Sequence, residues 1–458
     1  MYHSARWKTF TDFIFHFIRF PEVLGGPWGE VERKKSRENR HLLINWFEDV
    51  TAFLAPKIKT PGVPAVLPMT SLCSAYFKFA YDLYLIAHNC EAIPESVIQR
   101  LKTPGQFLGA YYEVVAAGIM IRAGFTLTYE NEEDGSRKHC EFIAKHTTTG
   151  DEFNVEAKIR ISKSEIPNVK WQLLRAFQKP AAHRRIIFIE LNTAVGASRE
   201  ELIAMMETLL GEIRALEHTL VMPDTGEPVP SAYLVITNNP PGSVENEHRP
   251  ILMVEGFKMP DFRVENLHAT LDDALDSRER HRAVVALVDS LRVHDRIPST
   301  FDGEIPAFAF GNIQNRLLIG QEFQIETPEE GEVAAVLVSG AVDEMNKVAM
   351  CSMTTVGGRN VIMSFTLSDD EITAYQQFPE TFFGVPQQVV TKATDALKVY
   401  DQNLACYRNT PKEMLLSFLA GRPDIEQLKE LPQEKLASVY ARDITEWMFR
   451  NSTPPPKV

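Results

Sequence analysis

Hydrophobic and polar positions divide the chain into three regions with different periodicities. Residues 1 to about 100 carry apolar side chains at helical spacing, which predicts helices around Leu42–Leu54 and Leu72–Ala87. From residue 101 to residue 262, helical patterns alternate with short strand-like runs. Residues 263–458 combine strand-like runs with further helical stretches. The pattern therefore predicts a helical N-terminal region, an α/β core and a mixed α/β and helical C-terminal region.

The core begins with an unusually apolar helix. The segment Phe107–Ile121 contains a single charged residue, Glu113, so we expect this helix to be buried nearly all round. A carboxylate in such surroundings is either paired inside the protein or used to bind a cation. Taken alone, the pattern favours a structural carboxylate that accepts hydrogen bonds from a core arginine or from backbone amides.

Three strand-like runs follow this helix: Phe125–Tyr129, His139–Lys145 and Glu152–Arg160. The second run carries Glu141, and strict alternation in the third places Glu156 and Lys158 on one face. Most Glu-x-Lys pairs of this kind lie on the solvated face of an edge strand. The core is completed by helices and strands at Asn168–Lys179, Arg184–Asn192, Ser198 onward and Tyr233–Thr237.

The order of these elements resembles that of the PD-(D/E)xK, or restriction-endonuclease-like, nuclease superfamily. The order is a helix with an inward glutamate, then a strand with an acidic residue, then a Glu-x-Lys strand. The matching residues are Glu113, Glu141 and the run Val155-Glu156-Ala157-Lys158. The family usually has aspartate on the second strand, so Glu141 is longer by one methylene, and Asp134 is the alternative acid. The resemblance covers less than a third of the chain. It implies an α/β fold (α+β overall) with a mixed central sheet flanked by helices.

The resemblance also implies an activity, that of a metal-dependent nuclease that hydrolyses phosphodiester bonds, with DNA favoured over RNA. Glu141 and Glu156 would hold Mg²⁺, or Mn²⁺ in its place, with the Ala157 carbonyl as a further ligand. Glu113 would bind a second ion or a metal-bound water, and Lys158 would orient the attacking water. Three neighbouring carboxylates would repel one another, and a cation makes such a cluster tenable.

The distribution of charge supports a site for a polyanion. The chain has 48 Lys and Arg against 61 Asp and Glu, a formal net charge of −13, which disfavours indiscriminate coating of nucleic acid. Residues 136–185 nevertheless hold eleven Lys and Arg and five Asp and Glu. The expected nucleic-acid contacts are Arg160, Lys163, Gln172, Arg175 and Lys179.

Other classes of protein lack their usual signatures. No segment approaches the roughly 20 apolar residues of a membrane span, since Lys78 and Asp82 interrupt the longest candidate. The five cysteines are scattered and form no CxxC pair, which predicts a cytoplasmic protein without a disulfide framework or structural zinc. Motifs of phosphate loops, Rossmann folds, zinc proteases and α/β-hydrolases do not occur.

Two alternatives use the same residues differently. A catalytically inactive descendant would keep the restriction-endonuclease-like fold as a binding or assembly module. A structural protein would use the Glu–Lys pairs as ordinary salt bridges. In the nuclease, the flanking regions 1–100 and 263–458 would present substrate or bind a protein partner, which includes a second copy of the chain in a homo-oligomer. We expect no contact with a membrane.

Overall fold

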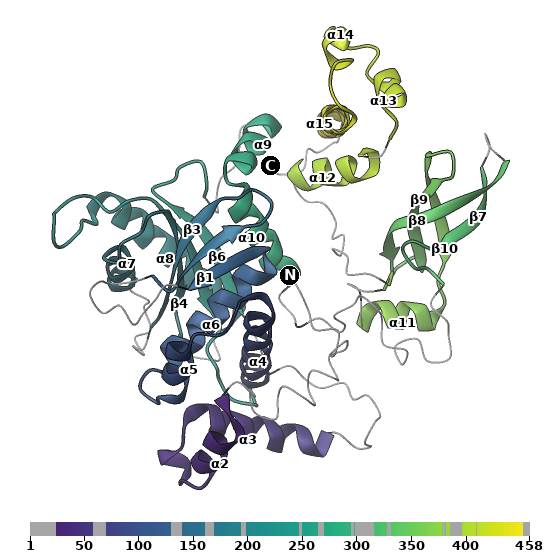
Figure 1. The fold of residues 1–458 in the computed structure, drawn as a ribbon. Helices are drawn as coiled ribbons and strands as arrows, with labels where there is room; N and C mark the ends of the chain where they lie inside the picture. The colour runs from purple at the N-terminus through teal and green to yellow at the C-terminus, as the bar shows by residue number, and fades with distance from the viewer. Residues whose placement is uncertain are drawn as a thin grey trace. The chain divides into compact units, whose positions relative to one another are not determined.

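The computed structural model describes residues 24–57, 70–129, 140–160, 169–193, 198–246, 250–263, 270–294, 297, 316–327, 331–377, 379, 382–384, 396–408 and 410–451. The chain divides into two compact units. One unit contains the described residues within 1–266 and 281–298, and the other contains those within 267–280 and 299–458. Both units combine helices with a sheet (Figure 1), which confirms the predicted mixed α/β class.

The first unit is built on a six-stranded sheet whose strands follow one another in chain order. The strands are β1 (Phe125–Tyr129), β2 (Phe142–His146), β3 (Glu152–Ile159), β4 (Arg184–Glu190), β5 (Ala232–Asn238) and β6 (Ile251–Phe257). Strands β1, β2 and β3 pair antiparallel, β3, β4 and β5 pair parallel, and β6 returns antiparallel to β5. The sheet is therefore mixed, and its parallel strands occupy the centre.

Helices surround this sheet (Figure 1). The helical elements of the first unit are α2 (Gly26–Arg33), η2 (Arg37–Asn39), α3 (Leu42–Leu54), η3 (Ala55–Lys57), α4 (Ser71–Asn89), α5 (Glu95–Lys102), α6 (Phe107–Arg122), α7 (Lys170–Phe177), α8 (Arg199–Thr219) and α10 (Arg282–Val293). The helices predicted around Leu42–Leu54 and Leu72–Ala87 are confirmed as α3 and α4. Helix α6 packs against β1, β3, α4, α5 and α10, so the apolar helix is central to the unit.

The pairing register identifies the face of the sheet to which each side chain points. Glu156 lies beside Ile187 and Lys158 beside Ile189, and directly paired residues project to the same side. Both isoleucines belong to the hydrophobic cluster that β4 forms with α7 and α8. Glu156 and Lys158 therefore point toward the layer of α7 and α8.

Helix α6 lies on the opposite face. Its Tyr112 hydroxyl is 2.8 Å from the hydroxyl of Thr237, which the register pairs with Glu190. Glu190 pairs in turn with Ile159, the residue that follows Lys158 on β3. Because successive side chains of a strand alternate between faces, α6 and the Glu156–Lys158 pair belong to different sides of the sheet.

The second unit contains a four-stranded antiparallel sheet in the order β10-β9-β8-β7. Its strands are β7 (Glu322–Thr327), β8 (Gly331–Asp343), β9 (Val348–Thr355) and β10 (Asn360–Thr366). Its helices are α9 (Leu271–Arg280), α11 (Asp369–Gln377), α12 (Ala396–Tyr407), α13 (Lys412–Phe418), α14 (Ile425–Leu428) and α15 (Gln433–Asn451). Within the described part of the chain, no helix is both long enough and apolar enough to cross a bilayer.

Candidate active site

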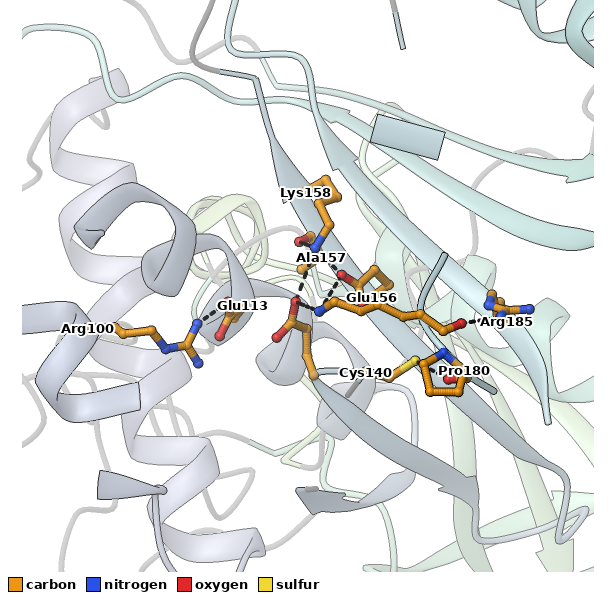
Figure 2. Close-up of polar contacts among 10 residues, drawn as sticks. Arg100, Glu113, Cys140, Glu156, Ala157, Lys158, Pro180 and Arg185 are labelled. Atoms are coloured by element: carbon orange, nitrogen blue, oxygen red, sulfur yellow. Dashed lines mark hydrogen bonds and ion pairs between the residues drawn. The ribbon is translucent and has the colours of Figure 1, made fainter. Parts of the chain in front are cut away.

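Two glutamates and two lysines meet between β2, β3 and the end of α7. The Lys158 ammonium donates to Glu156 Oε1 and lies 3.3 Å from Glu141 Oε1. The Lys179 ammonium lies 2.8 Å from Glu156 Oε1 and 3.1 Å from Glu141 Oε1. Figure 2 shows Glu156, Ala157 and Lys158 in this group, with dashed lines joining the interacting side chains. The same two ammonium groups thus contact one oxygen of each carboxylate.

Local structure explains why these groups converge. Glu141 directly precedes β2, and its backbone N–H donates to the carbonyl of Val155 across the hairpin, at 3.1 Å. That bond sets Glu141 beside Glu156, and the alternation of β3 brings Lys158 to the same face. Lys179 follows the last turn of α7, and its carbonyl accepts a 2.6 Å hydrogen bond from Arg185 of β4.

The segment that carries Lys179 is also attached to the segment that carries Glu141. The thiol of Cys140 lies 3.4 Å from the carbonyl of Pro180, in the geometry of a hydrogen bond. Figure 2 labels Cys140, Pro180 and Arg185 on this side of the cluster. Cys140, which has no obvious chemical partner in the sequence, thus helps to fix the spacing between the two segments.

Burial and charge push the pKa values of the two glutamates apart. Glu156 is 0% exposed, and this burial, together with the negative charge of Glu141, raises its pKa to about 8. Burial would also raise the pKa of Glu141, but Lys158 and Lys179 hold it below its ordinary value. Burial opposes the charge of Lys179, yet the two carboxylates raise its pKa above that of an ordinary lysine.

One oxygen of the cluster is left unsatisfied. Glu156 Oε2 is buried and has no hydrogen-bond partner among the described residues, while Oε1 contacts both lysines. A buried polar atom without a partner calls for an explanation such as a bound water or ion. Carboxylate oxygens beside a backbone carbonyl are also the donors that a hard divalent cation prefers. The donor set therefore fits Mg²⁺ or Mn²⁺.

Glu113 is placed differently from the other two glutamates. It is buried on α6, where its Oε1 accepts a 2.5 Å hydrogen bond from Arg100 of α5 (Figure 2). This is the pairing with an arginine that the apolar helix favours. Among the residues that the structure describes, no three His, Cys, Asp or Glu side chains form a group that could hold a metal ion. Glu113 does not join Glu141 and Glu156 in such a group.

The predicted nucleic-acid contacts lie in several environments. Arg175 is exposed on α7, whereas Gln172 is partly buried, and its side-chain oxygen has no partner in the described structure. Arg160 is only 3% exposed, and its guanidinium donates to the carbonyl of Leu191. Lys163, like the alternative acid Asp134, lies outside the described residues.

A further buried carboxylate, Glu190, lies at the end of β4, and its charge interrupts the apolar run of that strand. Its Oε1 accepts backbone hydrogen bonds from Asn192 and Asn239, at 3.0 and 2.9 Å. Its Oε2 accepts a 2.5 Å hydrogen bond from the hydroxyl of Thr237. Burial raises the pKa of Glu190 to about 7 against these hydrogen bonds. Glu190 thus connects the ends of β4 and β5.

No model of a known protein family matches the chain, and no curated protein matches it. The Glu141–Glu156–Lys158–Lys179 cluster is therefore interpreted from its own geometry.

Proposed function

We propose that the chain is a metal-dependent nuclease that hydrolyses phosphodiester bonds of nucleic acid, DNA in preference to RNA, on a restriction-endonuclease-like core. The observation that carries the proposal is that Glu141, which directly precedes β2, and Glu156 of β3 both contact Lys158, beside a carboxylate oxygen that has no partner in the described structure. The order α6-β1-β2-β3-α7-β4 and the mixed sheet support it, because the proposed superfamily has this order of elements.

Each residue of the cluster would have a separate role in the reaction. Glu141 and Glu156 would hold Mg²⁺, with the carbonyl of Ala157 next to them in the chain. When bound, the ion supplies a water of lowered pKa and offsets negative charge on the phosphate oxygens. Lys158 lies within reach of both carboxylates, and its Nζ is 3.2 Å from the Ala157 carbonyl. It would orient the attacking water and stabilise the charge that develops on the phosphate.

The surroundings of the cluster favour an anionic substrate. Helix α7 carries Lys170 and Arg175 and no acidic residue, and both basic side chains are exposed. Positive charge next to a carboxylate pair brings a polyanion to the site, while the carboxylates themselves bind the cation. The burial of Glu156 excludes bulk water from the centre of the cluster.

One observation favours the alternative of an inactive binding or assembly module. The formal charges of the two glutamates are already compensated by Lys158 and Lys179, and Glu113 is compensated by Arg100. The cluster is therefore tenable without a bound metal ion. A module of this kind would bind nucleic acid without cleaving it.

Cleavage assays test the proposal directly. Purified protein is incubated with plasmid, linear duplex and single-stranded DNA and with RNA, in Mg²⁺, in Mn²⁺ and in EDTA. We expect metal-dependent cleavage that falls by on the order of 100-fold or more in Glu156→Gln and Lys158→Met. Lys145→Met is the matched control, because Lys145 lies on β2 but pairs with Glu152. Undiminished cleavage by Glu156→Gln, or no cleavage of any substrate by the native protein, would contradict the nuclease proposal.

A further inference from the structure

We infer that Lys179 is a built-in counter-ion, which occupies the cation position of the Glu141–Glu156 pair and is released when divalent cation and nucleic-acid phosphate bind together. This inference rests on the proposed function and concerns how the same site is loaded. Lys179 is accordingly a positioning residue, which acts through the two carboxylates and through the phosphate.

The distances around Lys179 carry the first step. Its ammonium lies 2.8 Å from Glu156 Oε1 and 3.1 Å from Glu141 Oε1, so it bridges the two carboxylates. A divalent cation shared by the same carboxylates would meet this positive charge at close range. Like charges at such a separation repel strongly in a buried site. The ammonium of Lys179 therefore has to move before the carboxylates can share a divalent ion.

Lys179 is better placed to move than Lys158. Lys158 lies inside β3, and its ammonium also contacts the carbonyl of Ala157. Lys179 lies beyond the end of α7, outside the strand ladder that holds Lys158, although the two lysine side chains are equally exposed, at 21%. Its flexible four-carbon stem can redirect the ammonium while the backbone stays in place. The hydrogen bond from Arg185 to the Lys179 carbonyl keeps that backbone next to the site.

Release of Lys179 couples the two ligands. A lysine that leaves both carboxylates loses two ion pairs, and a substrate phosphate close to the site replaces them. Cation binding is therefore easier when nucleic acid is present, and by linkage nucleic acid binds more tightly when the cation is present. The coupling that passes through Lys179 disappears when residue 179 carries no charge, because Lys158 is then the only ammonium of the cluster that still contacts the two carboxylates.

Binding of Mn²⁺ to the full-length protein tests the inference. It is measured by calorimetry and by electron paramagnetic resonance of free Mn²⁺, with and without a nuclease-resistant phosphorothioate duplex. We expect Lys179→Met to bind Mn²⁺ about tenfold more tightly than the native protein without DNA, and to lose most of the effect of DNA on Mn²⁺ affinity. Lys179→Arg should retain the native values, and Lys145→Met controls for the loss of one positive charge.

The outcomes separate this inference from the proposed function. If Lys179→Met binds Mn²⁺ no more tightly than the native protein, while the native protein cleaves DNA, the counter-ion role is wrong and the nuclease assignment stands. If neither protein binds Mn²⁺ and neither cleaves nucleic acid, the proposed function is wrong and the inference fails with it. Should circular dichroism show that Lys179→Met is unfolded, Lys179→Gln takes its place, since it retains a polar side chain.

Discussion

Glu190 provides a sharp test of the electrostatics of the first unit. Its carboxylate is fully buried, and its hydrogen-bond donors are neutral groups of Asn192, Asn239 and Thr237. The substitution Glu190→Gln keeps the shape of the side chain and removes the charge. The new amide can donate to the Thr237 hydroxyl, which can then donate to the Tyr112 hydroxyl 2.8 Å away. The contacts of residue 190 with Asn192, Asn239 and Thr237 can therefore be retained.

The magnitude follows from the pKa of Glu190, which burial raises from 4.5 to about 7. Below pH 4.5 the carboxyl is protonated in both the folded and the unfolded chain, so its burial does not make the free energy of unfolding depend on pH. As the pH rises, the unfolded chain ionises first, and stability falls until the folded carboxyl ionises near pH 7. A difference of 2.5 pKa units corresponds to about 3 kcal/mol, lost mostly between pH 5 and pH 8.

Urea unfolding at pH 5 and at pH 8 measures this effect. Unfolding is followed by tryptophan fluorescence in a Trp447→Phe background. The other four tryptophans precede residue 172 and belong to the sequence of the first unit, whereas Trp447 belongs to that of the second. The remaining fluorescence therefore reports on the first unit. We expect the stability advantage of Glu190→Gln over the native protein to grow by roughly 2–3 kcal/mol from pH 5 to pH 8. Glu200→Gln on the exposed surface of α8 controls for the loss of one charge. Equal pH dependence of Glu190→Gln and the native protein would refute the reasoning.

Two further substitutions test packing and nucleic-acid binding. Gly118→Ala would place a Cβ 2.1 Å from the Asp82 carboxylate, which is buried in an ion pair with Arg122. We expect urea unfolding to show that the free energy of unfolding falls by about 3 kcal/mol. Gly109→Ala on the same helix meets no atom within 4 Å and should be neutral or slightly stabilising, so an equal loss there would contradict the steric explanation. Arg175→Ala should weaken DNA binding and reduce the salt slope by about one, and an unchanged slope would remove Arg175 from the interface.

The elements of the first unit could be predicted largely from the sequence. The apolar run from Phe107 predicts a helix to Ile121, and α6 ends at Arg122. The strand predicted at Arg184–Asn192 is confirmed as β4, which ends at Glu190. Agreement is close because periodicity and burial act in the same direction in both elements. Glu141 is predicted inside a strand but precedes β2, since the ladder with β3 begins one residue later.

The partners of charged side chains could not be predicted in the same way. Lys179 is expected at a phosphate, yet the structure places it between Glu141 and Glu156. Hydrophobic periodicity shows which face of α7 is buried, but it does not show where the end of the helix meets the sheet. Glu113 illustrates the same point, because its partner Arg100 lies on another helix and no local pattern connects the two.

The polar stripe of β3 also differs from the usual solvated face. Strict alternation is typical of a strand with one face in water, but β3 lies between β2 and β4, and its polar face points toward α7. Polar side chains on a strand covered on both sides need partners inside the protein. Asn154 accepts a hydrogen bond from the backbone of His183, and Arg160 donates to the carbonyl of Leu191. Both ends of the stripe therefore fasten β3 to the segments that flank β4.

The two residues in the middle of the stripe are not bonded to flanking backbone in this way. Glu156 and Lys158 bond mainly to each other and to the side chains of Glu141 and Lys179, and Glu156 Oε2 remains buried without a partner in the described structure. Such an atom costs about 1–3 kcal/mol of stability. If these residues served stability alone, we would expect Glu156 Oε2 to have a hydrogen-bond partner, as the side chains at the two ends of the same strand do. The oxygen without a partner therefore distinguishes the centre of β3 from the two ends of the strand, and it is the atom at which the proposed divalent cation would bind.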